Sequence, residues 1–417
     1  MFVLILSLII SLTETDSSDV QNYLHQAHHY FDQGSYLESI ECLESALAVD
    51  SSNAEIYHYL GYYTHYLCYD SRPYPNYSAN ISDTIIYYLT QSIILDPNLR
   101  DSYYFLGVEY GVISRKAIQF DQYDEVKESM IKGFLAGCYP PWLLEYARNT
   151  LDCCQQNAIL FISGDAEVNA ISYLQWIDNY RQDISPVIIP LCNRSWYIEI
   201  IKEGFHDLIV PVPISWNTEQ IYGTNNYKWN SNIIHTLLNS EIIRLYELED
   251  SVFQWTLSPD LTGYDREYLS PAKAIITDII EQNAFLRPVY FSLSSPALIT
   301  DDFDSSLILC GLARQLVPYN VCERGNEIDI ELLEIFLGEM ENFTNFQDLR
   351  ENDLPRVSQL LNNYRYLYLN LITYYYNLNN LTKANFLMQT MEEYLPDSIL
   401  PLPENLDTYI NQLRNSL

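Results

Sequence analysis

One short pattern occurs twice between Ala54 and Gly111, and it limits what this chain can fold into. The pattern is an aromatic residue, two variable residues, Leu and Gly. Its copies contain Tyr57, Leu60 and Gly61, and then Tyr103, Leu106, Gly107 and Tyr110. Residues three, four and seven positions apart share one face of a helix, and a small Gly on that face allows a second helix to approach closely. The pattern therefore predicts stacked pairs of helices.

This spacing is that of the first helix of a tetratricopeptide repeat. We predict three such repeats, from about Val20 to Asn53, from Ala54 to Leu99 and from Arg100 to about Pro140. The second is longer than the usual 34 residues because a Pro-rich loop at 69–78 separates its two helices. Three repeats are about the minimum that stack into a stable unit.

The first helices of such repeats line a groove, so we expect a protein or peptide partner rather than catalysis. The candidate groove residues are His28, Tyr62, His65 and Glu109. His25 and His29 have the spacing of two metal ligands on a helix, but no acidic residue stands between them in a zincin arrangement. We interpret them as helix surface and expect no metal and no cofactor.

The charge of the chain excludes several classes of partner. There are 22 Lys and Arg residues against 55 Asp and Glu residues, a net charge of −33. Nucleic acids and anionic membrane surfaces both need a basic protein surface, so we expect neither as a direct partner. The eight cysteines contain no C-x-x-C pair, which argues against a zinc ribbon. Cys310 with Cys322 is a candidate disulfide if the chain is exported.

The N-terminus is apolar from Met1 to Leu12 and turns polar at Thr13. A run of this length fits the core of a signal peptide and is too short to span a bilayer. We therefore predict a signal peptide at residues 1–17 and an exported protein. The alternative is a hydrophobic N-terminal helix on a cytoplasmic protein, because the usual basic residues before the apolar run are missing.

In the middle of the chain the spacing of apolar residues changes. Short apolar runs alternate with helical stretches, which predicts a small, mostly parallel α/β sheet. The predicted strands are Ala158–Ile162, Val187–Leu191, Leu208–Val210 and Arg287–Ser292, and the predicted helices include Trp196–Lys202 and Pro271–Gln282. The segment Trp216–Tyr268 has no clear period and is interpreted as an insertion. Arg365–Pro396 then reads as a further repeat-like helical hairpin.

The predicted fold class is a mixture of α/β and α+β architecture. Tetratricopeptide-like helical repeats occupy residues 18–150, a small α/β sheet domain occupies 151–325, and a helical domain with the repeat-like hairpin occupies 326–417.

One candidate site follows the first predicted strand, where Gly164 and Asp165 precede a helix. Proteins of α/β architecture place ligands outside the carboxyl ends of their strands. Asp165 and Glu167 can hold a metal or a sugar hydroxyl there. The alternative, which we favour, is that Asp165 caps the helix. No residue is assigned a catalytic role.

An ordered set of short motifs runs from Ala158 to Pro318. The set comprises Leu160-Phe161-x2-Gly164-Asp165, Tyr173-x-Gln175, Arg181-x-Asp183, Trp196-Tyr197, Arg287-Pro288-Val289-Tyr290-Phe291 and Gly311-Leu312-Ala313-x2-Leu316-Val317-Pro318. In order and spacing it resembles a family of bacterial membrane proteins related to a transmembrane protein O-mannosyltransferase of animals. Members carry a multi-span glycosyltransferase-like domain, a soluble α/β region and tetratricopeptide-like helices.

The resemblance implies that this chain corresponds to the soluble accessory part, separate from the multi-span domain that holds the sugar donor and the catalytic acid. The family usually has Asn-Asp-Thr after Gly-Asp, whereas this chain has Ala166-Glu167-Val168. No catalytic residue is therefore transferred. The leading hypothesis is a non-catalytic, exported protein-binding protein. The alternative is an enzyme or accessory subunit of glycan transfer, with a membrane glycosyltransferase as partner and a site at Gly164-Asp165.

Overall fold

The computed structural model describes residues 18–70, 79–223, 227–228, 232–263, 267–338 and 354–416. The chain divides into two compact units. The first comprises Met1–Lys116 and Glu128–Tyr139, and the second comprises Ala117–Lys127 and Pro140–Leu417. Within the described ranges no helix is both long and apolar enough to cross a membrane.

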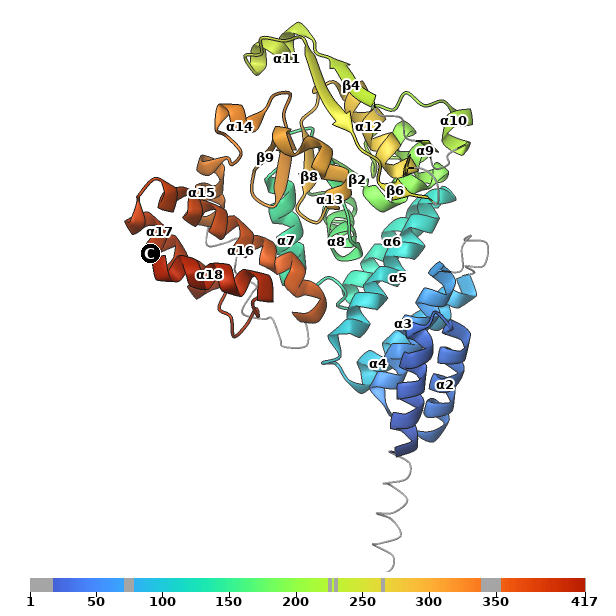
Figure 1. The fold of residues 1–417 in the computed structure, drawn as a ribbon. Helices are drawn as coiled ribbons and strands as arrows, with labels where there is room; N and C mark the ends of the chain where they lie inside the picture. Colours follow the sequence, from blue (N-terminus) through green and yellow to red (C-terminus); the bar gives the residue numbers. More distant parts are fainter. Residues whose placement is uncertain are drawn as a thin grey trace, which may run out of the picture. The chain divides into compact units, whose positions relative to one another are not determined.

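The first unit is built from helical hairpins (Figure 1). Residues 18–32 form its first helix. The helices that follow are α2 (Tyr36–Val49), α3 (Ala54–Asp70), α4 (Ala79–Leu95), α5 (Arg100–Gln119) and α6 (Tyr123–Leu135), the last two of which extend into the second unit. Gly34 closes the first hairpin in the left-handed region, with φ of 76°. A buried core that includes Leu24, Leu43 and Leu60 joins the first two hairpins. The N-terminal helical repeats are thus confirmed.

The Gly of each pattern copy lies where another segment approaches its helix closely. A Cβ atom added to Gly61 would lie 2.6 Å from Leu89 Cγ on α4. A Cβ atom added to Gly107 would lie 3.0 Å from the Cβ atom of Cys138. Both positions therefore need a residue without a side chain.

We expect the substitution Gly107→Leu to lower the free energy of unfolding by about 1–3 kcal/mol, because the added atoms overpack the contact with Cys138. Thermal or urea unfolding measures the loss. Gly338→Leu is the matched control, since an added Cβ atom there meets no atom of the described residues within 4 Å. An unchanged unfolding curve for Gly107→Leu would contradict the close contact between α5 and Cys138.

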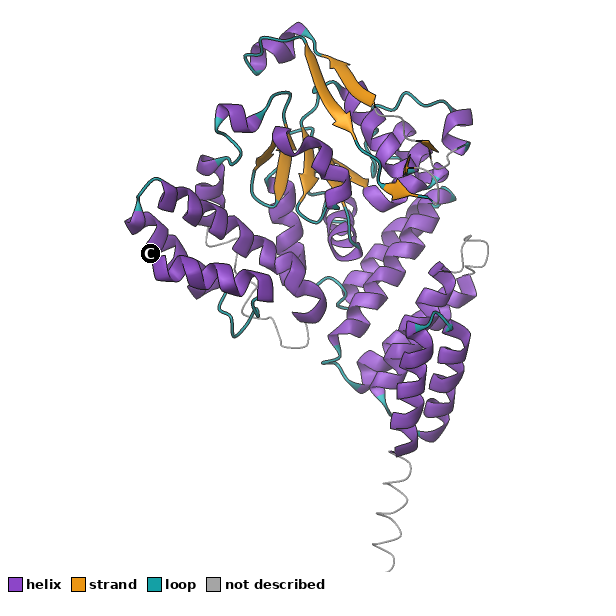
Figure 2. Cartoon of the chain, viewed as in Figure 1, coloured by secondary structure: helices purple, strands orange, loops and turns teal. Residues whose placement is uncertain are grey.

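The second unit contains a five-stranded sheet in the order β2-β1-β8-β10-β9 (Figure 2). The strands are β1 (Ile159–Ile162), β2 (Ser185–Ile188), β8 (Val289–Ser292), β9 (Leu307–Leu309) and β10 (Ala313–Leu316). The pairs β1–β2 and β1–β8 are parallel, whereas β8–β10 and β10–β9 are antiparallel. The sheet is mixed, and the prediction of a mostly parallel sheet was wrong in this respect.

Two of the predicted strands differ from the structure. Leu208–Val210 is not a strand of the sheet, because its residue Ile209 forms only an isolated bridge with the nearby Phe205. The strand predicted at Val187–Leu191 begins earlier, at Ser185, and gives way to a 3-10 helix, η1 (Ile189–Asn193). Pro190 lacks the N–H group that a continuing strand would use in pairing.

Alternate residues of the central strands face two separate hydrophobic cores. Leu160 and Tyr290 pack in a core with helices α7 (Pro141–Asp152) and α8 (Asp165–Trp176). Phe161 and Phe291 pack in the other core, with α9 (Ser195–Glu203) and α12 (Pro271–Asn283). Both faces of the sheet are therefore covered, which explains why β1 and β8 are buried along their whole length.

The described residues of the segment Trp216–Tyr268, for which no period was found, form short helices and strands. They are α10 (Thr218–Tyr222), β3 (Tyr227–Lys228), β4 (Asn232–Leu237), α11 (Ser240–Leu245), β5 (Val252–Leu257), β6 (Leu261–Thr262) and β7 (Glu267–Leu269). β4 and β5 pair with each other, and β3, β7 and β6 form a three-stranded sheet.

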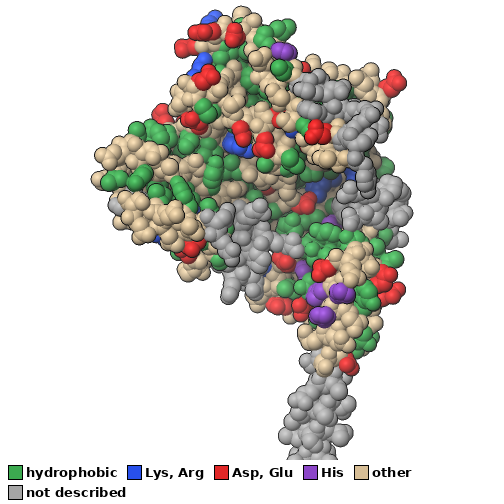
Figure 3. Space-filling model, viewed as in Figure 1, with side chains coloured by type: hydrophobic (Ala, Val, Ile, Leu, Met, Phe, Trp, Pro, Cys, Tyr) green, Lys and Arg blue, Asp and Glu red, His purple; other side chains and the backbone are tan. Residues whose placement is uncertain are grey.

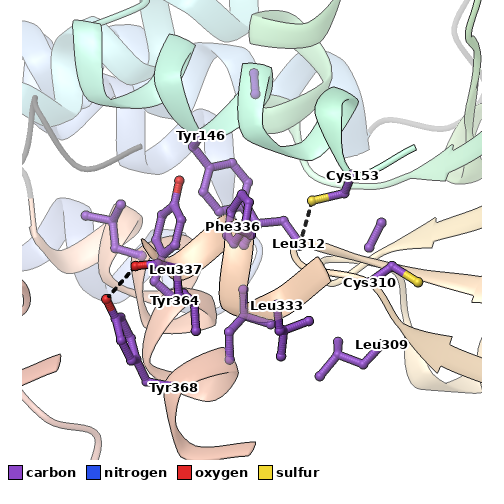
Figure 4. Packing of buried hydrophobic residues seen from close by; sticks show 14 of the residues in the cluster. Tyr146, Cys153, Leu309, Cys310, Leu312, Leu333, Phe336, Leu337, Tyr364 and Tyr368 are labelled. Carbon is purple, nitrogen blue, oxygen red and sulfur yellow. Dashed lines mark hydrogen bonds between the residues drawn. The ribbon is translucent and has the colours of Figure 1, made fainter. Parts of the chain in front are cut away.

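The C-terminal part is helical, as predicted. Its described elements are α15 (Ile330–Gly338), α16 (Leu354–Asn377), α17 (Leu381–Tyr394) and α18 (Glu404–Ser416). Before it lie α13 (Ala297–Thr300), η2 (Asp301–Ser306) and α14 (Val321–Arg324), within the range predicted as the α/β domain. The helical hairpin predicted at Arg365–Pro396 corresponds to α16 and α17. Figure 4 shows α15 and α16 residues, among them Phe336 and Tyr364, packed against Tyr146 of α7. The four predicted domain ranges stay predictions; in the structure α7 groups with the sheet.

Candidate functional site

Two of the four candidate groove residues form a buried pair between α3 and α5. His65 Nδ1 lies 3.1 Å from Glu109 Oε2, and both side chains are buried. Burial raises the pKa of the Glu109 carboxyl, and the hydrogen bond with His65 opposes this effect. Glu109 Oε1 accepts no hydrogen bond within the described ranges. These residues hold two first helices together and are not available as groove surface.

The other two candidates, His28 and Tyr62, are half-buried within a layer of aromatic rings. His28 Nδ1 lies 2.5 Å from the Tyr63 hydroxyl, and its ring packs edge-on to Tyr59 with centroids 4.4 Å apart. The Tyr62 ring lies 4.2 Å from Phe105 of α5. Tyr62 therefore joins the second and third repeats.

The surface of this layer is formed by residues that we call the aromatic face: Phe31, Tyr59, Tyr62 and Tyr66. Tyr62 contacts Phe31 and Tyr66 at centroid distances of 5.3 and 5.0 Å. Tyr66 is 36% exposed, and the other three are half-buried. The sequence interpretation missed Phe31, Tyr59 and Tyr66, although the density of Tyr in α3 was a usable signal.

Histidine side chains gather over the first repeat helices (Figure 3). His25 and His29 are exposed, as expected for helix surface. No group of three or more His, Cys, Asp or Glu side chains that could hold a metal occurs among the residues that the structure describes.

The second candidate site lies where β1 ends and α8 begins. Gly164, with φ of 88°, is the N-cap of α8, and Asp165 is the first helical residue. Asp165 is therefore not the cap itself; its exposed carboxylate acts on the helix dipole from the first turn. Glu167 is buried, and side chains two apart on a helix do not face each other. A joint metal site of Asp165 and Glu167 is thus not formed.

Glu167 is the distinctive group at this edge. It is 1% exposed, and its Oε2 atom accepts hydrogen bonds from the hydroxyls of Ser292, at 2.9 Å, and Ser294. Its Oε1 atom is buried and accepts none from the described residues. Burial raises the pKa of Glu167 to about 7, against the opposing effect of hydrogen bonds from the Ser294 and Ser292 hydroxyls and from the Ser163 backbone. The sequence interpretation missed both serines, although Ser292 ends the predicted strand Arg287–Ser292 and Ser294 lies two residues after it.

The position of Glu167 follows from the topology of the sheet. The chain passes from β1 through α8 to β2 on one side of β1, and β8 lies on the other side. The strand order therefore reverses between β1 and β8, whose carboxyl ends carry Ser163 and Ser292. In open α/β sheets this reversal point is where ligands bind.

The motif residues that carry the family resemblance hold the fold together. The Arg181 guanidinium donates to the backbone carbonyls of Leu151 and Cys154, and to Asp183. The Arg287 guanidinium donates to the carbonyls of Asn157 and Ala158. These contacts show that Arg181 and Arg287 stabilise the fold. They do not assign a catalytic or binding role to the motifs.

The cysteines form no disulfide among the described residues, and all eight are free thiols. Cys310 is buried and Cys322 is exposed, so the candidate bond between them is not formed in this structure. Cys153 instead accepts a hydrogen bond from the backbone N–H of Leu312 at 3.3 Å (Figure 4).

The fold combines N-terminal helical repeats with a domain built on a small mixed sheet and with C-terminal helices. Comparison with known proteins agrees with the first two of these parts. Residues 27–65 match the model of the TPR repeat family. Residues 143–262 match the family described as TMEM260-associated domain 2.

The sequence is also similar to a curated protein, Protein O-mannosyl-transferase TMEM260 of Mus musculus. The two are 37% identical over 54 residues, which are 13% of this chain and 8% of the mouse protein. A solved O-GlcNAc transferase structure from Thermobaculum terrenum covers 48% of this chain and 46% of its own, with 16% identity and a TM-score of 0.22. That score is too low to support an argument. The relation to TMEM260 and the tetratricopeptide repeat are thus supported.

Proposed function

We propose that this protein is a non-catalytic binding protein whose repeat unit holds a segment of a protein partner against the aromatic face. The match of residues 27–65 to a tetratricopeptide repeat carries the proposal, because such repeats commonly serve protein interaction. The half-buried rings of Phe31, Tyr59 and Tyr62 supply rigid apolar area of the kind that anchors interfaces.

Charge selects the kind of partner. Residues 18–116 contain 12 Asp and Glu against 4 Lys and Arg. Tyrosine rings attract Lys and Arg through cation–π contacts, and the surrounding carboxylates add long-range attraction. The partner segment is therefore expected to be basic.

A peptide array that contains Lys/Arg-rich, neutral and acidic peptides tests this proposal with the whole protein. We expect binding to the basic peptides, and Tyr62→Ala or Tyr66→Ala to weaken it about tenfold or more, the effect of losing an anchor residue. Tyr376→Ala is the matched control, since Tyr376 is similarly exposed, at 38%, on α16. Equal losses in all three variants, or preference for acidic peptides, would contradict the proposal.

A second candidate function is an accessory role in glycan transfer, with a membrane glycosyltransferase as the partner. Two observations favour it: the similarity to TMEM260, and a buried carboxyl with an unfilled acceptor at the reversal point of the sheet. Co-purification from native membranes followed by mass spectrometry tests it. Recovery of a multi-span glycosyltransferase is the expected result.

We also propose that the protein is exported, on the basis of the apolar run from Met1 to Leu12. The mature chain is then expected to begin between Thr15 and Val20. N-terminal sequencing of the native protein checks this, and an intact Met1 in a cytosolic fraction would show the proposal to be wrong.

A further inference from the structure

We propose that the free edge of β4 pairs with the same edge of a second copy of this chain, the two strands running antiparallel about a two-fold axis at His235. β4 (Asn232–Leu237) bonds to β5 (Val252–Leu257) in a two-stranded ribbon, with α11 at its joined end (Figure 1). The ribbon belongs to the second unit, whereas the aromatic face belongs to the first, so the two proposed surfaces use different residues.

The strand register shows which backbone groups of β4 point away from β5. The Leu238 N–H donates to the Ser251 carbonyl oxygen at 2.9 Å, which makes these two residues a hydrogen-bonded pair. Hydrogen-bonded and non-hydrogen-bonded pairs alternate along antiparallel strands. The N–H and C=O groups of Ile233, His235 and Leu237 therefore point outward. Within the described ranges no other strand pairs with this edge, and no backbone group bonds to it.

The edge of β4 lacks the features that usually prevent pairing with another chain. Natural edge strands are commonly protected by charged residues or Pro, and Asn232–Leu237 contains neither. Ile233 and Leu237 are 56% and 75% exposed. The opposite face of the ribbon is fixed, because Phe253 and Trp255 are buried in the core that also contains α12. β4 is thus a held, uncharged strand whose outward groups are ready to pair.

The sequence of β4 favours its own copy as the partner strand. About a two-fold axis at His235, Ile233 of each copy lies opposite Leu237 of the other, so the same apolar cross-strand contact forms twice. The outward N–H and C=O groups of these three residues then bond to one another. A charged residue in a different partner strand would lie against the apolar side chains, and neither β4 nor β5 contains a counter-charge. An interface of this symmetry closes as a dimer.

The expected dimer is weak and responds to salt. Stable interfaces bury about 1,200–2,000 Å², more than one short strand pair supplies, so we expect a dissociation constant in roughly the micromolar range. The net charge of −33 on each copy opposes association. Salt screens this repulsion, so higher salt is expected to strengthen the dimer. An interface held by ion pairs would respond in the opposite direction.

Sedimentation velocity of the whole protein, at concentrations below and above that constant, tests the inference. We expect a dimer that is stronger in about 0.5 M than in about 0.05 M NaCl. Hydrogen-exchange mass spectrometry is expected to show slower exchange in β4 at high protein concentration. His235→Pro removes one outward N–H and no bond to β5, and should weaken the dimer at least about tenfold. Gln254→Pro is the matched control, because Gln254 pairs with His235 and its N–H points out of the opposite edge of the ribbon.

A second pair of variants keeps the test valid if the Pro variants do not fold, which circular dichroism shows. His235→Lys places two ammonium groups about 5 Å apart across the axis and should weaken the dimer. Gln254→Lys places them about 14 Å apart, beyond the Debye length of about 8 Å, and should not. A monomer at every concentration, a dimer with unchanged exchange in β4, or equal effects of the substitutions at His235 and Gln254 would overturn the inference.

Discussion

Replacement of Lys273 by Met is expected to lower the free energy of unfolding by about 3–5 kcal/mol, because it leaves a buried carboxylate without its charge partner. Lys273 Nζ of α12 lies 2.8 Å from Asp302 Oδ2, and both side chains are less than 5% exposed. The same ammonium group donates to the Leu298 carbonyl oxygen at 2.8 Å. The ion pair therefore joins α12 to η2, the 3-10 helix that precedes β9. Urea unfolding followed by circular dichroism measures the change.

Lys132→Met is the control for this prediction, because it makes the same replacement in an exposed ion pair. Lys132 Nζ lies 2.8 Å from Glu128 Oε1, but the two side chains are 56% and 64% exposed. Exposed pairs contribute about 0–1 kcal/mol. A loss in Lys273→Met no larger than that in Lys132→Met would mean that the Lys273–Asp302 pair is solvated.

The second large effect is a pH dependence that comes from Glu167. Burial raises the pKa of this carboxyl from 4.5 to about 7 in the folded protein. Between these two pH values the folded state keeps a proton that the unfolded state has lost. The contribution of this proton to the free energy of unfolding is therefore fully present below pH 4.5, decreases as pH rises toward about 7, and is absent above that pH. The total loss is roughly 3 kcal/mol.

The comparison of the parent with Glu167→Gln isolates this contribution, because glutamine has no proton to lose. The nearby Tyr146 does not titrate in this range, since burial raises its pKa well above 10. Relative to the parent, Glu167→Gln is expected to gain roughly 3 kcal/mol between pH 4.5 and pH 8, measured by urea unfolding at several pH values. If the free energy of unfolding changed with pH in the same way in both proteins, the raised pKa of Glu167 would be contradicted.

Local patterns in the sequence were sufficient to predict the repeat helices, α9, α12 and the α16–α17 hairpin, whereas α7 was not predicted. The repeat glycines Gly61 and Gly107 indicated close contacts, and the structure has them. α9 and α12 lie within a residue or two of the predicted ranges. Such features depend on spacing along one helix, which a single sequence displays directly.

The parts that were missed depend on contacts between distant segments. β9 and β10 have three and four residues, and they are strands because β10 pairs with β8 and β9 pairs with β10. In the sequence, Glu167 is an acidic residue in the first turn of a helix, a common position for such residues. Its hydrogen bonds with Ser292 and Ser294 depend on where β8 lies, which the sequence does not display. His65 and Glu109 were placed on the correct helices, but their burial is set by how α3 packs on α5.

The packing of α7 against α16 has a consequence for how the chain acquires its structure. Asn149 donates to the Tyr364 hydroxyl, and Asn363 donates to the Tyr146 hydroxyl, across 215 and 217 residues of sequence. At a synthesis rate of about 5–20 residues per second, α16 is synthesised roughly 10–40 s after α7. The apolar side of α7 remains uncovered during this time. Contacts of such long range also slow folding itself. The nascent second unit therefore spends that interval with an uncovered apolar surface, during which a chaperone has a site to bind.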